Sequence, residues 1–169
     1  PEPQPTPKAI KGLNGLVLKN MDVLIIDEVS MVRADLIDSI AESLRINTNN
    51  HRSPFAGKTV VFIGDMHQLP PIVATSKEKQ LFQDHYDTPY FFSAESLKTV
   101  EPITKVLTTT FRQKDQEFID LLNNIRIGND LEATINILNA RCYISEGATD
   151  SVMTLTTINA RADNINQAR

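Results

Sequence analysis

The stretch Val23-Leu24-Ile25-Ile26-Asp27-Glu28 places four apolar residues directly before two carboxylates. A short continuous run of this kind is typical of a strand buried on both faces, as in a parallel sheet. A second run, Val60-Val61-Phe62-Ile63, ends in the same way at Gly64-Asp65. Apolar residues at helical spacing predict a helix from Ala34 to Ile46 between the two runs. The order strand, helix, strand indicates a right-handed βαβ unit in an α/β fold.

Acidic residues stand where each predicted strand ends. In open α/β sheets, ligands bind beyond the carboxyl ends of the strands, where Asp27 and Asp65 fall. An acidic pair after an apolar strand is the Walker B arrangement, in which Asp27 can hold Mg²⁺ against nucleotide phosphates. Glu28 can then polarise an attacking water. The alternative is an acidic loop that helps to cap the next helix.

Two further segments have side chains suited to phosphate chemistry. Gly64 and the pair Pro70-Pro71 predict a rigid loop, in which Gln68 can contact a phosphate and a water together. An ordinary turn ended by proline is the other interpretation. Arg112 follows a predicted third core strand, Lys105 to Thr108. An arginine there either stabilises transition-state charge or forms a surface ion pair.

The remainder of the chain is predicted in outline. The segment Pro1 to Pro7 alternates proline with polar residues and should be extended. Tyr90 to Phe92 is either a short strand or a packed loop. The later elements predicted are helices over about 115–127 and 130–140, a strand over 152–155 and a final helix near Ala160.

Composition narrows the class of protein. The 169 residues are 41% hydrophobic with a formal net charge of −4, which fits a globular domain and neither predicts nor forbids nucleic acid. The sequence contains no apolar run of the roughly 18 residues that a membrane span needs. Cys142 is the single cysteine, which excludes a disulfide framework and indicates a reducing, cytoplasmic compartment. The 3 histidines lack metal-ligand spacing, so a zinc site is not expected.

Taken together, three segments resemble motifs II, III and IV of superfamily 1 DNA helicases. They are Asp27 to Met31, Gly64 to Pro71, and Phe111 to Gln113. The resemblance is strongest to the petite-integration-frequency (PIF) helicase family, whose nearest relatives are RecD-like helicases. The pattern after motif IV also fits, at Phe118, Leu121-Leu122 and Arg126-Ile127-Gly128.

The resemblance implies a RecA-like parallel sheet flanked by helices, in a motor that hydrolyses ATP to move 5′ to 3′ along single-stranded DNA. It implies that Asp27 holds Mg²⁺ and that Glu28 positions the hydrolytic water. It also implies that Gln68 reports the γ-phosphate state and that Arg112 is an arginine finger. Asp65 would support the site without binding the metal, and His67 is a candidate DNA contact.

The sequence also departs from the family pattern. A P-loop requires Gly-x-x-x-x-Gly-Lys-Ser/Thr, and the 169 residues contain no such string. Because the chain starts at Pro1 rather than Met, we expect a window cut from a longer motor. We expect it to be inactive alone, with an extended lead-in over 1–20, part of a first RecA-like domain over 21–142 and the truncated start of a second over 143–169. In the sheet of the family that the chain resembles, the P-loop strand lies between the second predicted strand and the strand at Val106. We expect that position to be vacant here, and the gap to be closed by rearrangement of the sheet, by another segment of the chain or by self-association.

Two other classes of function remain open. One is a non-enzymatic interaction module that has lost its P-loop. The other is a metal-dependent nuclease built on Asp27, Glu28 and Asp65. ATP-independent cleavage of DNA with a divalent metal would favour the nuclease.

Overall fold

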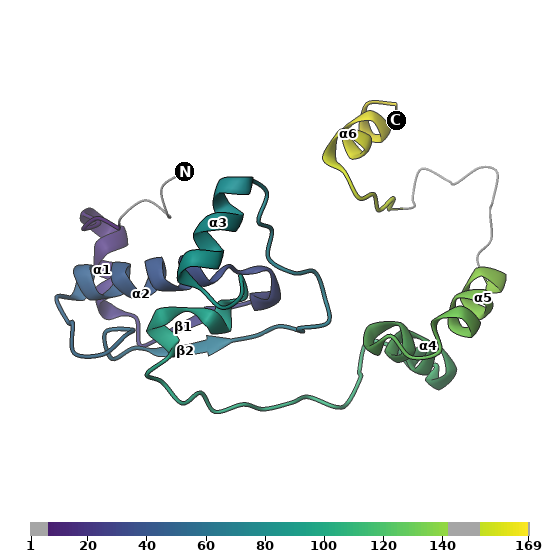
Figure 1. Ribbon diagram of the computed structural model, residues 1–169, viewed down its shortest axis with the longest axis horizontal. Coiled ribbons are helices and arrows are strands. Elements are labelled where there is room, and N and C mark those ends of the chain that lie inside the picture. The colour runs from purple at the N-terminus through teal and green to yellow at the C-terminus, as the bar shows by residue number, and fades with distance from the viewer. Residues whose placement is uncertain (1–6, 142–152, 169) are drawn as a thin grey trace. The chain divides into compact units, whose positions relative to one another are not determined.

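The computed structural model describes residues 7–141 and 153–168 and divides into two compact units, Pro1–Lys114 and Asp115–Arg169. The first unit holds all the strands described and the helices that pack on them (Figure 1). Its elements are α1 (Gly12–Asn20), β1 (Val23–Ile26), the 3₁₀ turn η1 (Val29–Met31), α2 (Ala34–Thr48), β2 (Thr59–Phe62), α3 (Ser76–His85), and the 3₁₀ turns η2 (Phe91–Ser93) and η3 (Glu95–Leu97). The second unit contains α4 (Gln116–Ile127), α5 (Leu131–Arg141) and α6 (Asn159–Gln167).

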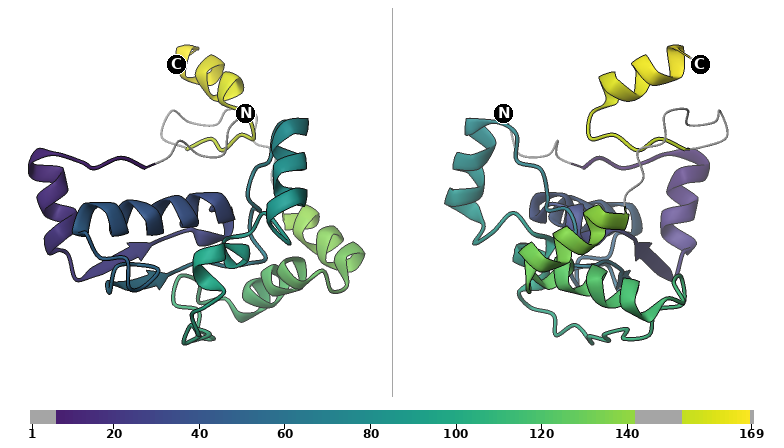
Figure 2. Two further views of the ribbon diagram at one scale, coloured as in Figure 1. Left: turned by 60° about the vertical axis from the view of Figure 1, so that its left-hand side comes forward. Right: turned by 90° about the vertical axis from the view of Figure 1, so that its right-hand side faces the viewer.

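Strands β1 and β2 pair in parallel and are joined by α2, which confirms the predicted βαβ unit. The register joins Val23 to Thr59 and Ile26 to Phe62. Helix α2 lies along one face of this small sheet (Figure 2). Its buried positions recur at helical spacing and form the centre of the core: Ala34, Ile37, Ala41 and Leu44. Full burial of each of its two large side chains, Ile37 and Leu44, contributes about 1.5–3 kcal/mol.

The sheet is covered on one face only among the described residues. Side chains that point toward α2 are half-buried and pack on the core: Leu24, Ile26, Val60 and Phe62. The opposite face carries Val23 and Ile25, which are 51% and 60% exposed, and also Val61 and Ile63. The prediction that both strands are buried on both faces is therefore wrong, because the helices described in this unit pack against a single side.

The predicted strand from Lys105 to Thr108 is also wrong. Residues 101–111 form no regular element, and Val106 and Leu107 are 79% and 92% exposed. A strand needs a hydrogen-bonded neighbour, and the described sheet contains β1 and β2 alone. A β-branched sequence without an adjacent strand gains nothing from its propensity.

The beginning and end of the chain differ in part from expectation. Residues 12–20 were expected in an extended lead-in, but they form α1, which contacts α2. Residues 153–155 are not a strand, whereas the final helix is confirmed as α6. Residues 1–6, Cys142 and Val152 lie outside the described residues. The domain boundary predicted near residue 142 stays a prediction.

Local sequence signals explain the helices of the second unit. The side chain of Asp115 accepts a hydrogen bond from the Phe118 amide, 3.2 Å away, and so caps α4. The helix ends at Gly128, which adopts the left-handed φ of 74° that glycine tolerates. Both ends of α4 match the prediction to within a residue. No helix in the described part of the chain is long and apolar enough to cross a bilayer.

Candidate functional site

The parallel ladder brings the first two motifs to one edge of the sheet. The Ile63 amide donates to the Ile26 carbonyl over 2.9 Å, and the Val29 amide donates back to the Ile63 carbonyl over 2.9 Å. These two bonds extend the pairing past the ends of β1 and β2. Asp27-Glu28 and Gly64-Asp65 therefore lie side by side at the carboxyl edge, as the sequence predicts.

The acidic pair has an unusual backbone. Both carboxylates are exposed, and one oxygen of Asp27 accepts a hydrogen bond from the Glu28 amide over 2.8 Å. Glu28 adopts the left-handed conformation, with φ 52° and ψ 40°. This conformation costs a residue with a side chain about 1–2 kcal/mol, and such strain is concentrated at functional sites.

Gly64 is required by close packing rather than by a positive φ. A β-carbon at this position would lie 3.0 Å from the Val29 nitrogen and 3.2 Å from the Ser30 nitrogen. Backbone atoms cannot move aside as a flexible side chain can. The glycine therefore lets the backbone of the second motif lie directly against that of the first.

Beneath this contact lies a residue that the sequence reasoning missed. Ser30 is fully buried, and its hydroxyl has no hydrogen-bond partner among the described residues. Its neighbour Val29 is 4% exposed. The short turn η1 after the acidic pair is thus anchored in the core, which holds Asp27 and Glu28 at the surface above it.

Asp65 shapes the loop that carries Gln68. Its carboxylate accepts a hydrogen bond from the His67 amide over 3.0 Å, and its carbonyl accepts one from the Gln68 amide over 3.0 Å. These bonds form a tight turn that leaves the side chains of His67 and Gln68 exposed. Pro71 is buried and fixes the far end of the loop.

The third predicted segment is not joined to the first two. Arg112 is exposed, lies in the irregular stretch before α4, and makes no ion pair or hydrogen bond with other described residues. Its position depends on the preceding residues 105–108, which are not held as a strand. The structure therefore assembles Asp27, Glu28 and the Gln68 loop, and leaves Arg112 apart from any contact with them.

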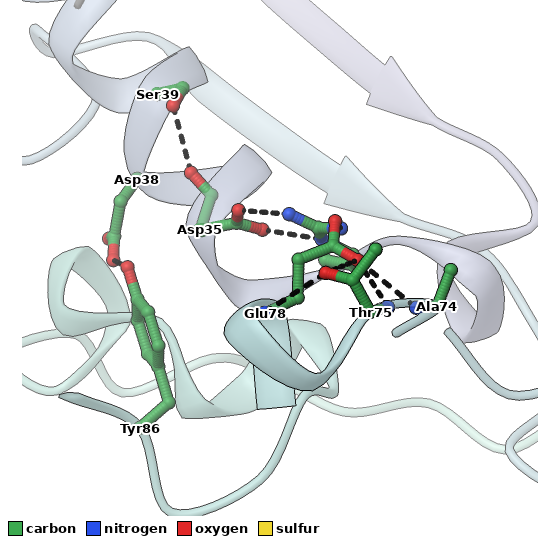
Figure 3. A network of polar contacts seen from close by, with 8 residues as sticks. Asp35, Asp38, Ser39, Ala74, Thr75, Glu78 and Tyr86 are labelled. Atoms are coloured by element: carbon green, nitrogen blue, oxygen red, sulfur yellow. Dashed lines mark hydrogen bonds and ion pairs between the residues drawn. The ribbon is translucent and has the colours of Figure 1, made fainter. Parts of the chain in front are cut away.

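A network of polar contacts between the start of α2 and the start of α3 is the second feature that the sequence reasoning missed (Figure 3). Arg33 donates from Nε and Nη2 to both oxygens of Asp35, over 3.0 and 2.5 Å, and from Nη1 to Glu78 over 2.7 Å. These hydrogen bonds raise the pKa of the Arg33 guanidinium further above its ordinary range, against the lowering effect of its partial burial. The spacing Thr75-x-x-Glu78 is a capping-box signature that the sequence does contain.

Asp38, also in α2, is the centre of a second polar cluster. Its carboxylate accepts hydrogen bonds from the Tyr86 hydroxyl (3.0 Å) and from the amides of Glu95 (3.1 Å) and Ser96 (2.8 Å). Burial, followed by the hydrogen bond to Asp38, raises the pKa of Tyr86 above its ordinary value. This cluster attaches η3 to α2, and none of its hydrogen bonds involves the acidic pair.

The donor set suits Mg²⁺ bound together with a nucleotide. Mg²⁺ in such sites is held by one or two carboxylates, with phosphate oxygens and water completing the shell. Asp27 and Glu28 supply two exposed carboxylates at the strand end. The described residues contain no group of three or more His, Cys, Asp or Glu side chains placed to hold a metal by themselves.

Comparisons with known proteins agree with the resemblance in the motifs. A family model described as PIF1-like helicase matches residues 11–135. The chain is 38% identical to the ATP-dependent DNA helicase PIF1 of Emericella nidulans over 87% of its own length and 19% of that protein. It is 37% identical to the ATP-dependent DNA helicase RRM3 of Saccharomyces cerevisiae over 74% of its length and 17% of that protein.

Solved structures show the same relationship. Bacteroides Pif1 bound to ssDNA superposes with a TM-score of 0.86 and 33% identity, covering 96% of this chain and 38% of that one. Bacteroides Pif1 in complex with ADP-AlF3 and ssDNA superposes with a TM-score of 0.86 and 32% identity, covering 95% and 38%. The chain thus spans less than a fifth of the two curated relatives and under two fifths of these solved chains.

Proposed function

The chain belongs to the PIF1-like helicase family, and on this basis we propose that it forms part of the motor of an ATP-dependent DNA helicase. One observation carries the proposal. The β1–β2 ladder sets the Asp27-Glu28 pair beside the loop that holds Gln68, at the edge of a RecA-like sheet where ligands bind. In the intact protein this motor would move 5′ to 3′ along single-stranded DNA.

The acidic pair has two roles in this proposal. Asp27 holds Mg²⁺, directly or through water, because its second oxygen remains available after the first accepts the Glu28 amide. The metal, when bound with ATP, neutralises charge on the phosphates. Glu28 accepts a hydrogen bond from the attacking water, and its left-handed backbone places it in the turn that follows β1.

Gln68 and Arg112 act on the phosphate side of the reaction. Gln68 stands exposed on a loop held by Asp65 and reports the γ-phosphate state. Arg112 stabilises the negative charge of the transition state once the segment before it is held in position. The exposed His67 is a candidate contact for DNA.

The 169 residues alone are proposed to be inactive as an ATPase. They contain neither the backbone cradle nor the lysine of a P-loop, and phosphoryl transfer requires positioning and charge stabilisation together. Purified chain should therefore show no ATP hydrolysis above background. Robust activity that is abolished by Glu28→Gln would overturn this part of the proposal.

The metal role can be tested on the chain itself. Paramagnetic Mn²⁺, used in place of Mg²⁺, should broaden amide NMR signals around Asp27 and Gly64 before others. The Asp27→Asn variant should lose this local effect. Asp22→Asn is the matched control, because Asp22 is an exposed carboxylate just before the opposite end of β1. Equal broadening in wild type and Asp27→Asn would refute the metal role.

Self-association is proposed from the open face of the sheet. Val23, Ile25, Val61 and Ile63 form a row of exposed apolar side chains, which water solvates poorly. A second molecule that covers this face would bury them. Sedimentation at increasing concentration should show a reversible dimer that Ile25→Lys weakens. A monomer at all concentrations would exclude it.

A further inference from the structure

We propose that Arg33 is a positioning residue, which sets the loop carrying Gln68 in place relative to the Asp27-Glu28 pair. The roles of those three residues rest on the proposed function. The positional role of Arg33 stands on the contacts of the chain alone. Three observations support it: where Arg33 is attached, what its partner Glu78 holds, and how exposed the apolar side chains in the middle of the loop are.

Arg33 is attached firmly to the segment that follows the acidic pair. It comes two residues after η1 and makes a bidentate bond to Asp35 in the first turn of α2. Its side chain is 18% exposed and that of Asp35 is 2% exposed. The guanidinium also lies over the ring of Phe82 in α3, with 5.2 Å to the ring centroid. Arg33 therefore bridges the start of α2 and the body of α3.

Glu78 carries the connection from Arg33 to the loop. While Oε1 accepts from Arg33, Oε2 accepts from the amides of Ala74 (3.1 Å) and Thr75 (3.0 Å) and from the Thr75 hydroxyl (3.1 Å). One carboxylate thus joins the guanidinium to the two residues at which the loop ends. From Ala74 the chain returns to Gln68 through Pro70-Pro71, whose fixed φ angles leave little freedom.

Apolar packing holds the middle of this loop only in part. A cavity of about 210 Å³ lies between the two segments and is lined by Met31, Leu36 and Ile72, together with Arg33 itself. Leu69 and Ile72 are 67% and 71% exposed. Pro71 is buried and Val73 packs on the core near the end of the loop, whereas the other contacts described here are polar. The start of the loop lies directly against η1, and the charged network fixes its far end relative to the segment that follows η1.

An arginine is needed because the position has three acceptors in two directions. The planar guanidinium satisfies both oxygens of Asp35 with one edge and reaches Glu78 with another nitrogen. A lysine ammonium is a point charge on a flexible stem and cannot reproduce this fork. Replacing Arg33 also leaves the buried Asp35 without its charge partner, so an independent variant at Glu78 is required.

The test measures the loop position by pulsed electron paramagnetic resonance on the full chain without nucleotide or metal. Spin labels are placed at His51→Cys, beyond the C-terminal end of α2, and at Leu69→Cys, in a Cys142→Ser background. Arg33→Met and Glu78→Gln should each broaden the distance distribution and add a second, displaced component. Arg45→Met is the matched control, because the ion pair of Arg45 with Glu42 lies within α2; its distance distribution should stay unchanged.

A merely structural role predicts a different pattern. In that case Arg33→Met and Glu78→Gln would lower the melting temperature but leave the distance distribution of the folded molecules unchanged, which would overturn the proposal. If Arg33→Met does not fold, Glu78→Gln alone decides between these outcomes. Arg33→Lys should give a distance distribution that is narrower than that of Arg33→Met but broader than that of the wild type. A distribution equal to that of the wild type would show that the guanidinium fork is unnecessary. Because no metal or nucleotide is present, failure of the Mn²⁺ test would leave this result intact.

Discussion

Replacing Gly64 with alanine tests how closely the two motifs pack. The added β-carbon would lie 3.0 Å from both the nitrogen and Cγ1 of Val29 and 3.2 Å from the Ser30 nitrogen, where ordinary contact begins at 3.4 Å. Two of the three atoms belong to the backbone of η1, whose residues Val29 and Ser30 are buried. The chain must therefore shift to accept the methyl group.

Overpacking of this kind costs about 1–3 kcal/mol of unfolding free energy. For a domain near 100 residues, each kcal/mol lowers the melting temperature by about 4–8 °C. We therefore expect Gly64→Ala to lower the Tm by about 4–24 °C, measured by circular dichroism. Hydrogen exchange should also quicken at the Val29 amide, because its bond to the Ile63 carbonyl spans the displaced contact.

A double variant distinguishes backbone contact from side-chain contact. Val29→Ala removes Cγ1 but leaves both nitrogens in place, so it should not rescue Gly64→Ala, and the two effects should add. Rescue by Val29→Ala would show that the side chain alone makes the close contact. An unchanged Tm and unchanged exchange in Gly64→Ala would refute the packing argument entirely.

Three further predictions concern strain and pH. Glu28→Gly should raise the unfolding free energy by up to about 1 kcal/mol, since glycine adopts the left-handed backbone freely; a loss of stability in chemical denaturation would contradict this. Hydrogen bonds from the Thr75 backbone, and then from Arg33, lower the pKa of Glu78 from 4.5 to about 2. Its contribution is therefore present above pH 4.5 and lost as the pH falls toward 2, so Glu78→Gln should flatten stability over that range in acid titrations. The raised pKa of Tyr86 has the opposite consequence, because its stabilisation is present below its ordinary value of 10.0 and lost at higher pH. Tyr86→Phe should remove that alkaline loss, and an unaltered alkaline transition would contradict the assignment.

The elements predicted correctly are those whose local pattern is reinforced by their neighbours. Four apolar residues before Asp27 form β1, and the stripe beginning at Ile37 forms α2, because each packs on the other. The pattern at Val106 is equally apolar but forms no strand, since propensity contributes only when an adjacent strand is present. The apolar pattern of one β-strand carries no information on whether a neighbouring β-strand exists.

The candidate site likewise has parts that the sequence predicts and parts that it does not. The position of Asp27 beside Asp65 follows from strand ends, which a sequence pattern can locate. The link from Arg33 to Glu78 spans 45 positions in the chain, and nothing near Arg33 in the sequence indicates it. The capping box at Thr75 was visible as a spacing, but its carboxylate has a second partner that only the fold provides.

The parallel pairing of β1 with β2 also has a consequence for how the chain folds. Every strand pair joins residues 36 positions apart, as Val23 is to Thr59. Closing so long a loop costs entropy before any ladder bond forms, and such non-local pairing slows folding. During synthesis, β1 leaves the ribosome well before its partner exists, with its apolar residues unpaired. Helix α2 is made in that interval, and its apolar stripe offers a surface on which the apolar residues of β1 can pack before β2 exists.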